Sequence, residues 1–312
     1  MISTARAMAY ARPVQLIDAL SLVAQGYVAI AGGTDYYPAR VAQPISDALL
    51  DLSAIREMRA IDDCDLNHDS QTTLGALTTW TDCLKHPFPK ALVALAQAAK
   101  QIGGWQIQNR ATLGGNLCNA SPAADGTVVL LALNAQVTLS SLQMDRAVSA
   151  PLDRTVSAPS DRTVSTLVER SLPIDHFVLG NRKTALLPNE LLRAITIPRY
   201  SERAKSVFLK LGGRQYLVIS IVMVAVLIDT DMAGRISHCA IAVGACNRAA
   251  IRLTQLEQAL TGMPTLQASD RLRQILPTAL QALQPIDDVR GSANYRLHAA
   301  AVLIQQAVDQ CL

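Results

Sequence analysis

Apolar and polar positions divide the chain into an N-terminal part of short mixed elements and a C-terminal part of strands followed by helices. In the first part, Leu16, Leu20 and Val23 form one helical stripe between Pro13 and Gly26. The same reasoning predicts helices at 13–26, 90–102 and 128–133, and strands at 28–31, 48–52, 72–76 and 136–140.

The C-terminal part has a different pattern. Two strongly apolar, β-branched segments at 219–229 and 236–243 predict a hairpin, with a further strand expected at 206–211. Helices are expected at 250–260, 268–283 and 295–308. Strands followed by helices indicate a separate α+β domain, which places the domain boundary near 198–205.

An eight-residue repeat occupies 144–167, in three copies that share an Asp-Arg-x-Val-Ser core. Pro151 and Pro159 prevent a continuous helix, and three such copies cannot build a core of their own. The repeat therefore predicts a surface loop or an extended hairpin, and a recognition loop is the alternative.

Composition narrows the class of protein. The 312 residues are enough for about two domains, and half of them are hydrophobic. A net charge of +3 and 4% aromatic residues argue against a nucleic-acid partner. The most apolar stretch, 216–228, is shorter than the about 20 residues of a membrane-spanning helix, and no secretory signal is visible.

The six cysteines form no C-x-x-C pair, and no Cys/His cluster has the spacing of a zinc or iron–sulfur site. We therefore expect a reduced, cytoplasmic chain without a metal site. The five histidines are dispersed, and none forms a recognisable catalytic arrangement, so no catalytic residue is assigned.

Two glycine loops carry the strongest chemical signal. Gly32-Gly33 and Gly114-Gly115 each follow an apolar segment, and successive exposed N–H groups at such turns suit a phosphate anion. Thr34, Thr112 and Asn116 add short polar side chains for phosphate or ribityl oxygens. Either loop alone could be a tight turn, and neither matches G-x-G-x-x-G, which disfavours a nicotinamide-binding Rossmann domain.

The loops also resemble a known family. Ala31-Gly-Gly-Thr-Asp35, Ala111-Thr-Leu-Gly-Gly-Asn116 and Asn119-Ala-Ser-Pro-Ala-Ala-Asp125 look like the FAD motifs of the medium, flavin-binding subunits of molybdenum hydroxylases. That family includes the flavoprotein subunits of carbon monoxide dehydrogenase and xanthine dehydrogenase. Further similar segments are 187–192, Lys210-x-x-x-Arg214 and 288–296, so the resemblance covers nearly the whole chain.

The resemblance implies an α+β fold. An FAD-binding domain with two subdomains, of the PCMH or vanillyl-alcohol-oxidase-like type, would occupy 1–200. Its subdomains would lie at about 1–60 and 61–200, with the repeat as an insert at 144–167. A smaller C-terminal flavoprotein domain, with an antiparallel sheet and helices, would follow at 201–312.

The resemblance also implies a set of cofactor-binding residues. The first loop would hold the pyrophosphate, the second would complete that cradle, and Asn119 and Asp125 would reach ribityl or ribose hydroxyls. Ile102 and Leu187 would pack near the rings, with Lys210 beside the flavin. The implied set is Ile30, Ala31, Gly32, Gly33, Thr34, Asp35, Ile102, Thr112, Gly114, Gly115, Asn116, Asn119, Asp125, Leu187 and Lys210.

Some alternatives for these residues stay open. Asp125 could instead cap the following helix, and Lys210 and Arg214 could be ordinary strand-edge charges. Because the first loop contains no His or Cys that could tether the cofactor, FAD is expected to bind non-covalently. Relatives often carry an acid shortly after the basic pair, where this chain has the apolar Leu217-Val-Ile219.

The function implied is that of an oxidoreductase subunit. It would pass electrons from the iron–sulfur clusters of a small 2Fe-2S subunit, through FAD, to a terminal acceptor. A molybdopterin-binding large subunit would process the substrate. A stand-alone FAD-dependent oxidoreductase and a non-enzymatic nucleotide-binding protein are the alternatives.

Overall fold

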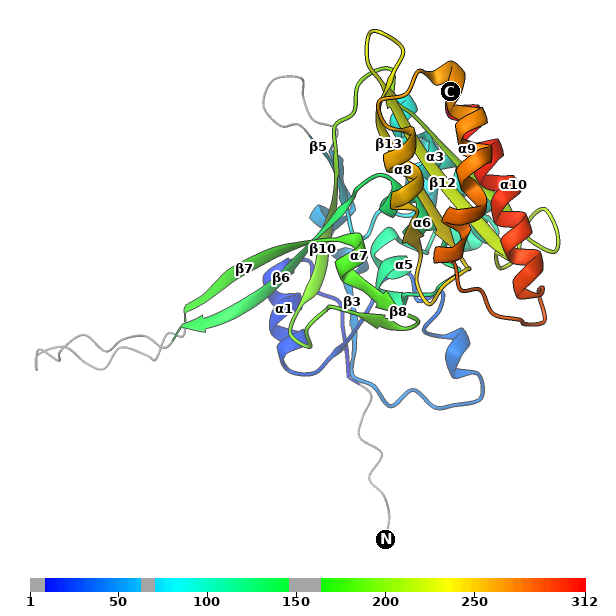
Figure 1. Ribbon diagram of the computed structural model, residues 1–312. Helices are drawn as coiled ribbons and strands as arrows, with labels where there is room; N and C mark the ends of the chain where they lie inside the picture. The colour runs from blue at the N-terminus through cyan, green and yellow to red at the C-terminus, as the bar shows by residue number, and fades with distance from the viewer. Residues whose placement is uncertain (1–8, 63–70, 146–163) are drawn as a thin grey trace, which may run out of the picture.

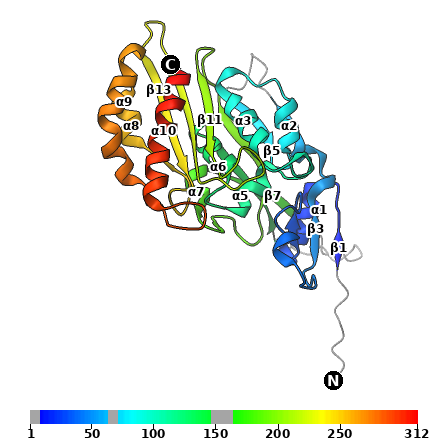
Figure 2. The same cartoon turned by 90° about the vertical axis from the view of Figure 1, so that its right-hand side faces the viewer.

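The fold consists of sheets with helices packed against them in layers. A computed structural model describes residues 9–62, 71–145 and 164–312. Figure 1 shows the N-terminal elements at one end and a long hairpin that extends away from the body. In Figure 2, the C-terminal sheet stands between its own helices on one side and N-terminal helices on the other.

A small parallel sheet begins the fold. Its middle strand β3 (Leu49–Asp51) pairs with β1 (Tyr10–Ala11) and β2 (Val28–Ile30). Helix α1 (Leu16–Ala24) buries the stripe that the apolar spacing predicts. The first glycine loop starts where β2 ends, at the carboxyl edge of this sheet.

The second sheet is antiparallel, in the order β4-β5-β10-β6-β7. The sequence did not reveal β10, whose partners β5 and β6 lie far from it along the chain. The strands are β4 (Ile61–Asp62), β5 (Gln71–Gly75), β6 (Gln136–Asp145), β7 (Val164–Pro173) and β10 (Leu191–Pro198).

Short helices lie between these strands, and residues of α2, α4, α5 and α6 line the cleft described below. Their bounds are α2 (Trp80–Lys85), α3 (Val93–Gln101), α4 (Trp105–Gln108), α5 (Leu113–Asn119), α6 (Asp125–Ala132) and α7 (Ile174–Phe177). Strands β8 (Val178–Gly180) and β9 (Lys183–Thr184) form a two-stranded turn after α7. All residues of α6 are buried, including the polar residues Asp125 and Thr127.

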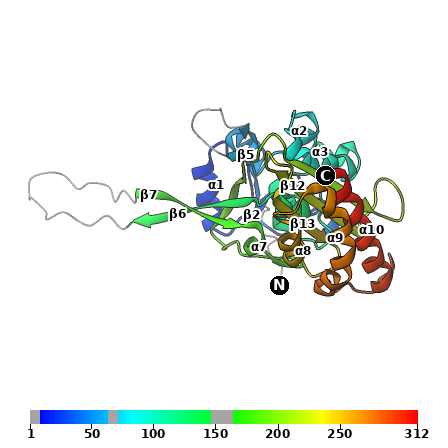
Figure 3. The same cartoon turned by 45° about the horizontal axis from the view of Figure 1, so that its top comes forward.

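Strands β6 and β7 pair along their full lengths and form the extended hairpin. Figure 3 shows this hairpin extending away from the layered body. The two ends of the eight-residue repeat lie within it, so the hairpin interpretation is correct for 144–145 and 164–167. The rest of the repeat, 146–163, lies outside the described residues.

The C-terminal sheet is antiparallel in the order β11-β12-β13-β14 and is followed by three helices, as the sequence predicts. The expected helix at 250–260 starts later, at Thr254, because Ile251 and Arg252 pair with β13. The elements are β11 (Lys205–Leu211), β12 (Val222–Thr230), β13 (Ile236–Gly244), β14 (Ile251–Arg252), α8 (Thr254–Leu260), α9 (Thr265–Ala279) and α10 (Ala293–Cys311).

Strand β12 explains how the two parts of the chain pack together. Its side chains alternate between the two faces of the sheet. Met223, Ala225 and Leu227 pack into the core shared with the N-terminal elements. Val224 and Val226 pack into the core under α8, α9 and α10. An all-apolar strand is therefore required, because both of its faces are covered.

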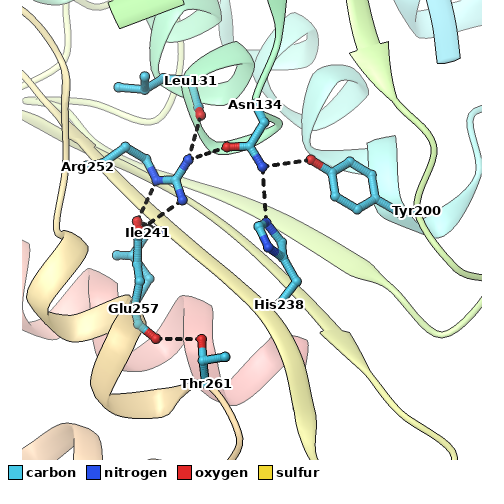
Figure 4. A network of polar contacts seen from close by, with 8 residues as sticks. All are labelled: Leu131, Asn134, Tyr200, His238, Ile241, Arg252, Glu257 and Thr261. Carbon is cyan, nitrogen blue, oxygen red and sulfur yellow. Dashed lines mark hydrogen bonds and ion pairs between the residues drawn. The ribbon is translucent and has the colours of Figure 1, made fainter.

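A polar network also joins the two parts, as Figure 4 shows. Arg252 of β14 donates to Asn134 Oδ1 at 2.6 Å and forms an ion pair with Glu257 of α8 at 2.5 Å. Asn134 Nδ2 donates to Tyr200 Oη at 3.2 Å and contacts His238 Nε2 at 3.1 Å. The turn after α6 is thereby bonded to β13, β14 and the connection that precedes β11.

Asn134 should be sensitive to substitution for two separable reasons. Its φ of 49° lies in the left-handed region, and its side chain makes the contacts just described. We expect Asn134→Ala to lower the free energy of unfolding by about 2–4 kcal/mol. Asn134→Gly should cost less, because glycine tolerates this conformation. Urea denaturation measures both, and equal losses would contradict the backbone contribution.

Candidate functional site

The two glycine loops, distant in the sequence, touch each other in the structure. A Cβ at Gly32 would overlap the carbonyl oxygen of Arg110, so only glycine permits this approach of two backbones. Asn119 Nδ2 also donates to Asp35 Oδ1 at 3.0 Å. The convergence predicted from the sequence is therefore present.

The first loop offers free backbone donors. Among the described residues, the N–H groups of Gly32, Gly33, Thr34 and Asp35 make no hydrogen bond. Gly33 has a φ of 70°, and a Cβ there would lie 2.6 Å from the Tyr37 ring. Successive unpaired N–H groups of this kind form a backbone arrangement that suits an anion.

The second loop differs from the first, because its glycines belong to the first turn of α5. Thr112 caps this helix and accepts from the Gly115 N–H at 3.0 Å. The N–H of Leu113 donates to Thr78 O, and that of Gly114 donates to Ala76 O. The N–H groups expected to be free in this loop therefore already donate to protein acceptors. What this loop presents to the cleft is the first turn of α5.

A cleft of about 690 Å³ lies between these segments. Ile107, Val218 and Ile219 line its rim, and Arg182 lines its wall from the turn between β8 and β9. All but two of the residues expected to bind the cofactor line it: Ile30, Ala31, Gly32, Gly33, Thr34, Asp35, Ile102, Thr112, Gly115, Asn116, Asn119, Asp125 and Lys210.

The two exceptions, Gly114 and Leu187, line a second, more apolar hollow of about 410 Å³. Gly114 is buried against Ala76, so its missing side chain allows α5 to pack, while Leu187 is half exposed. The hollow and the cleft share four residues: Ala29, Ala31, Gly115 and Cys118. The two spaces therefore adjoin each other at these residues.

Asp125 does not cap α6. It is the first residue of that helix, and its side chain makes no capping hydrogen bond. Its Oδ2 lies 2.6 Å from Lys210 Nζ, and its Oδ1 accepts from Ser220 Oγ at 2.5 Å. Burial raises the pKa of the Asp125 carboxyl, and the nearby Lys210 ammonium opposes that rise.

The basic pair Lys210 and Arg214 separates in the structure. Lys210 lies on β11, an edge strand of the C-terminal sheet, but its side chain is 5% exposed and paired with Asp125, so it is not an ordinary solvated strand-edge charge. Arg214 is exposed and donates to the carbonyl oxygen of Leu217, whose φ is 55°. Ile219, which is 55% exposed, lines the cleft together with Val218 and gives it an apolar rim.

Two buried polar atoms in the cleft wall have no hydrogen-bond partner among the described residues. They are Trp80 Nε1 and Asn116 Oδ1. Unpaired buried polar groups are costly, so a ligand that pairs with them would be stabilised. Together with the free N–H groups of the first loop, they make the cleft suitable for a polar, anionic cofactor.

Several of these residues could not be singled out from the sequence. Trp80, Arg182 and Ser220 lie outside both glycine loops, and no local pattern marks them. Cys118 lines both hollows. The described residues contain no group of three His, Cys, Asp or Glu side chains placed to hold a metal ion. Likewise, no helix in the described parts of the chain is both long and apolar enough to cross a membrane.

Comparison with known proteins gives the family. Residues 6–160 match the model of the FAD-binding domain in molybdopterin dehydrogenase. Residues 208–311 match that of the CO dehydrogenase flavoprotein C-terminal domain. The chain belongs to the FAD-binding medium subunits of molybdenum hydroxylases. Within this family, both domain models and their order along the chain agree with the observed α+β fold.

Members of the family resemble the chain over most of its length. The nicotinate dehydrogenase FAD-subunit of Eubacterium barkeri is 29% identical and covers 86% of this chain and 82% of its own. The putative xanthine dehydrogenase FAD-binding subunit XdhB of Escherichia coli K12 is 29% identical, and the match covers 97% of this chain and 95% of that subunit. A chain in the carbon monoxide dehydrogenase structure from Hydrogenophaga pseudoflava is 26% identical and superposes with a TM-score of 0.77. The match covers 97% of this chain and 96% of that one.

Proposed function

We propose that this chain is the FAD-binding electron-transfer subunit of a molybdenum hydroxylase complex. The observation that carries the proposal is the contact between the two glycine loops at the cleft. Free N–H groups of the first loop suit a diphosphate. FAD, when bound, supplies a ring that accepts and releases electrons.

We propose that the cofactor lies along the cleft and the neighbouring hollow. FAD has two ring systems joined by a diphosphate, and the two spaces meet at Gly115. Gly32, Gly33, Thr34 and Asp35 would donate their N–H groups, and the exposed Arg182 would add a cation near the anion. The remaining expected residues would line the walls, with Leu187 and Gly114 on the side of the hollow.

This arrangement depends on both parts of the chain. Asp125 comes from α6 and Lys210 from β11, and both line the cleft. A division into domains at 1–200 and 201–312 would therefore place the flavin between them. With no His or Cys in the first loop, the bond to FAD would be non-covalent.

The partners of the subunit follow from its relatives. The 6-hydroxypseudooxynicotine dehydrogenase complex subunit alpha of Paenarthrobacter nicotinovorans is named as part of a complex, and others are named medium chains. We infer that a molybdopterin-binding large subunit and a 2Fe-2S small subunit accompany this chain. Electrons would come from the small subunit and leave to a terminal acceptor.

We also propose a cytoplasmic location. Cys83, Cys239, Cys246 and Cys311 are free thiols buried in the cores, and unpaired cysteines are typical of reducing compartments.

Flavin binding and reduction test the function. The purified chain should bind about one FAD, turn yellow and release the flavin on denaturation. Its flavin should be reduced by the substrate of the complex only when the large and small subunits are present. A chain that retains no FAD would contradict the assignment. Reduction by a small substrate without partners would instead favour a stand-alone oxidoreductase.

A further inference from the structure

Asp125, Lys210 and Ser220 form a buried cluster at the cleft wall whose members come from different layers. Asp125 begins α6, Lys210 lies in β11, and Ser220 lies just before β12. The carboxylate is bonded on both oxygens, by Lys210 at 2.6 Å and by Ser220 at 2.5 Å. All three side chains are nearly inaccessible to solvent.

The position of this cluster is unusual for a structural ion pair. Burying two charges costs desolvation energy that their attraction often does not exceed, so an apolar pair could serve packing equally well. Both charged residues line the space assigned to FAD. A charge at this wall has little water around it, so it acts strongly on the electrons of a nearby ring.

We propose that Asp125 sets the reduction potential of the bound flavin by neutralising Lys210, with Ser220 as a positioning residue. This inference rests on the proposed function. Two electrons and one proton convert the oxidised flavin ring to its anionic reduced form. A lone Lys210 cation would stabilise that anion and hold the electrons. The paired carboxylate cancels this effect and keeps the reduced flavin a good electron donor.

The charge balance predicts the direction for each variant. Asp125→Asn should leave Lys210 uncompensated and favour the reduced flavin about tenfold, which is about 30 mV for a two-electron couple. Lys210→Met should move the midpoint potential the opposite way, because the carboxylate then stands alone. The double variant should return close to the wild-type potential. Ser220→Ala should give a smaller shift in the direction of Asp125→Asn.

The experiment is a dye-equilibrated redox titration of each FAD-loaded chain. Glu257→Gln is the matched control, because it also removes the charge of a buried, arginine-paired carboxylate but lies outside the cleft. It should leave the potential unchanged.

Flavin content, measured first, separates the two proposals. A wild-type chain without FAD would contradict the proposed function. A loaded Asp125→Asn chain with the wild-type potential would overturn only the charge assignment. A double variant whose midpoint potential does not return close to the wild-type value would also overturn only the charge assignment. A folded Asp125→Asn chain that loses FAD would also overturn it, because the carboxylate would then be needed to hold the cofactor.

Discussion

Gly115→Val should abolish FAD binding while the chain remains folded. A Cβ at Gly115 meets only Thr112 Oγ1, at 3.0 Å, and otherwise points into open space at the junction of the two hollows. The valine methyl groups would occupy the space of the cofactor. We expect the dissociation constant to rise at least about 100-fold, which is about 2.7 kcal/mol of binding free energy. Flavin fluorescence titration of the apoprotein measures it.

The fold should tolerate this change, because valine is a better helix former than glycine. Gly213→Val is the matched control, since Gly213 is exposed, lines neither hollow and has nothing within 4 Å of an added Cβ. Gly33 is a less informative target. Its φ of 70° and the Tyr37 ring would distort the loop itself. Full flavin content in Gly115→Val would show that the start of α5 does not face the cofactor.

Arg296→Leu should strongly destabilise the C-terminal domain. Arg296 is 2% exposed and donates to Ile221 O at 2.5 Å and to Ala245 O at 3.1 Å. Its second terminal nitrogen forms an ion pair with Asp288 at 2.6 Å. It therefore ties α10 to the start of β12, the end of β13 and the loop before α10. Removing it would leave buried carbonyl groups unpaired.

The expected loss is about 3–5 kcal/mol in the free energy of unfolding, measured by urea denaturation. Arg273→Leu is the matched control, because Arg273 pairs with Asp270 on the exposed face of α9. That change should stay within about 0.5 kcal/mol. A loss below about 1 kcal/mol for Arg296→Leu would show that solvent or neighbouring groups replace its contacts.

Local patterns were sufficient for much of the fold. The β12–β13 hairpin and the helices after it follow from runs of β-branched residues and helical spacing, which depend only on near neighbours. Strand β10 was missed because its pairing with β5 and β6 is a long-range property. Helix α5 was missed because a glycine pair is typical of a turn, whereas the Thr112 cap and the contact with Ala76 favour a helix.

The sequence by itself determined that the chain carries the two glycine loops of an FAD-binding family, since those motifs are local and specific in combination. That the loops and Lys210 share one FAD site stays a prediction. Only the tertiary structure decided which backbone donors remain free. The carbonyl groups of Ala76 and Thr78 accept from N–H groups of α5, whereas the N–H groups of the first loop make no hydrogen bond to any described residue. It also decided that Asp125 pairs with Lys210, because the start of α6 and β11 come together only when α6 packs against the C-terminal sheet in the shared core.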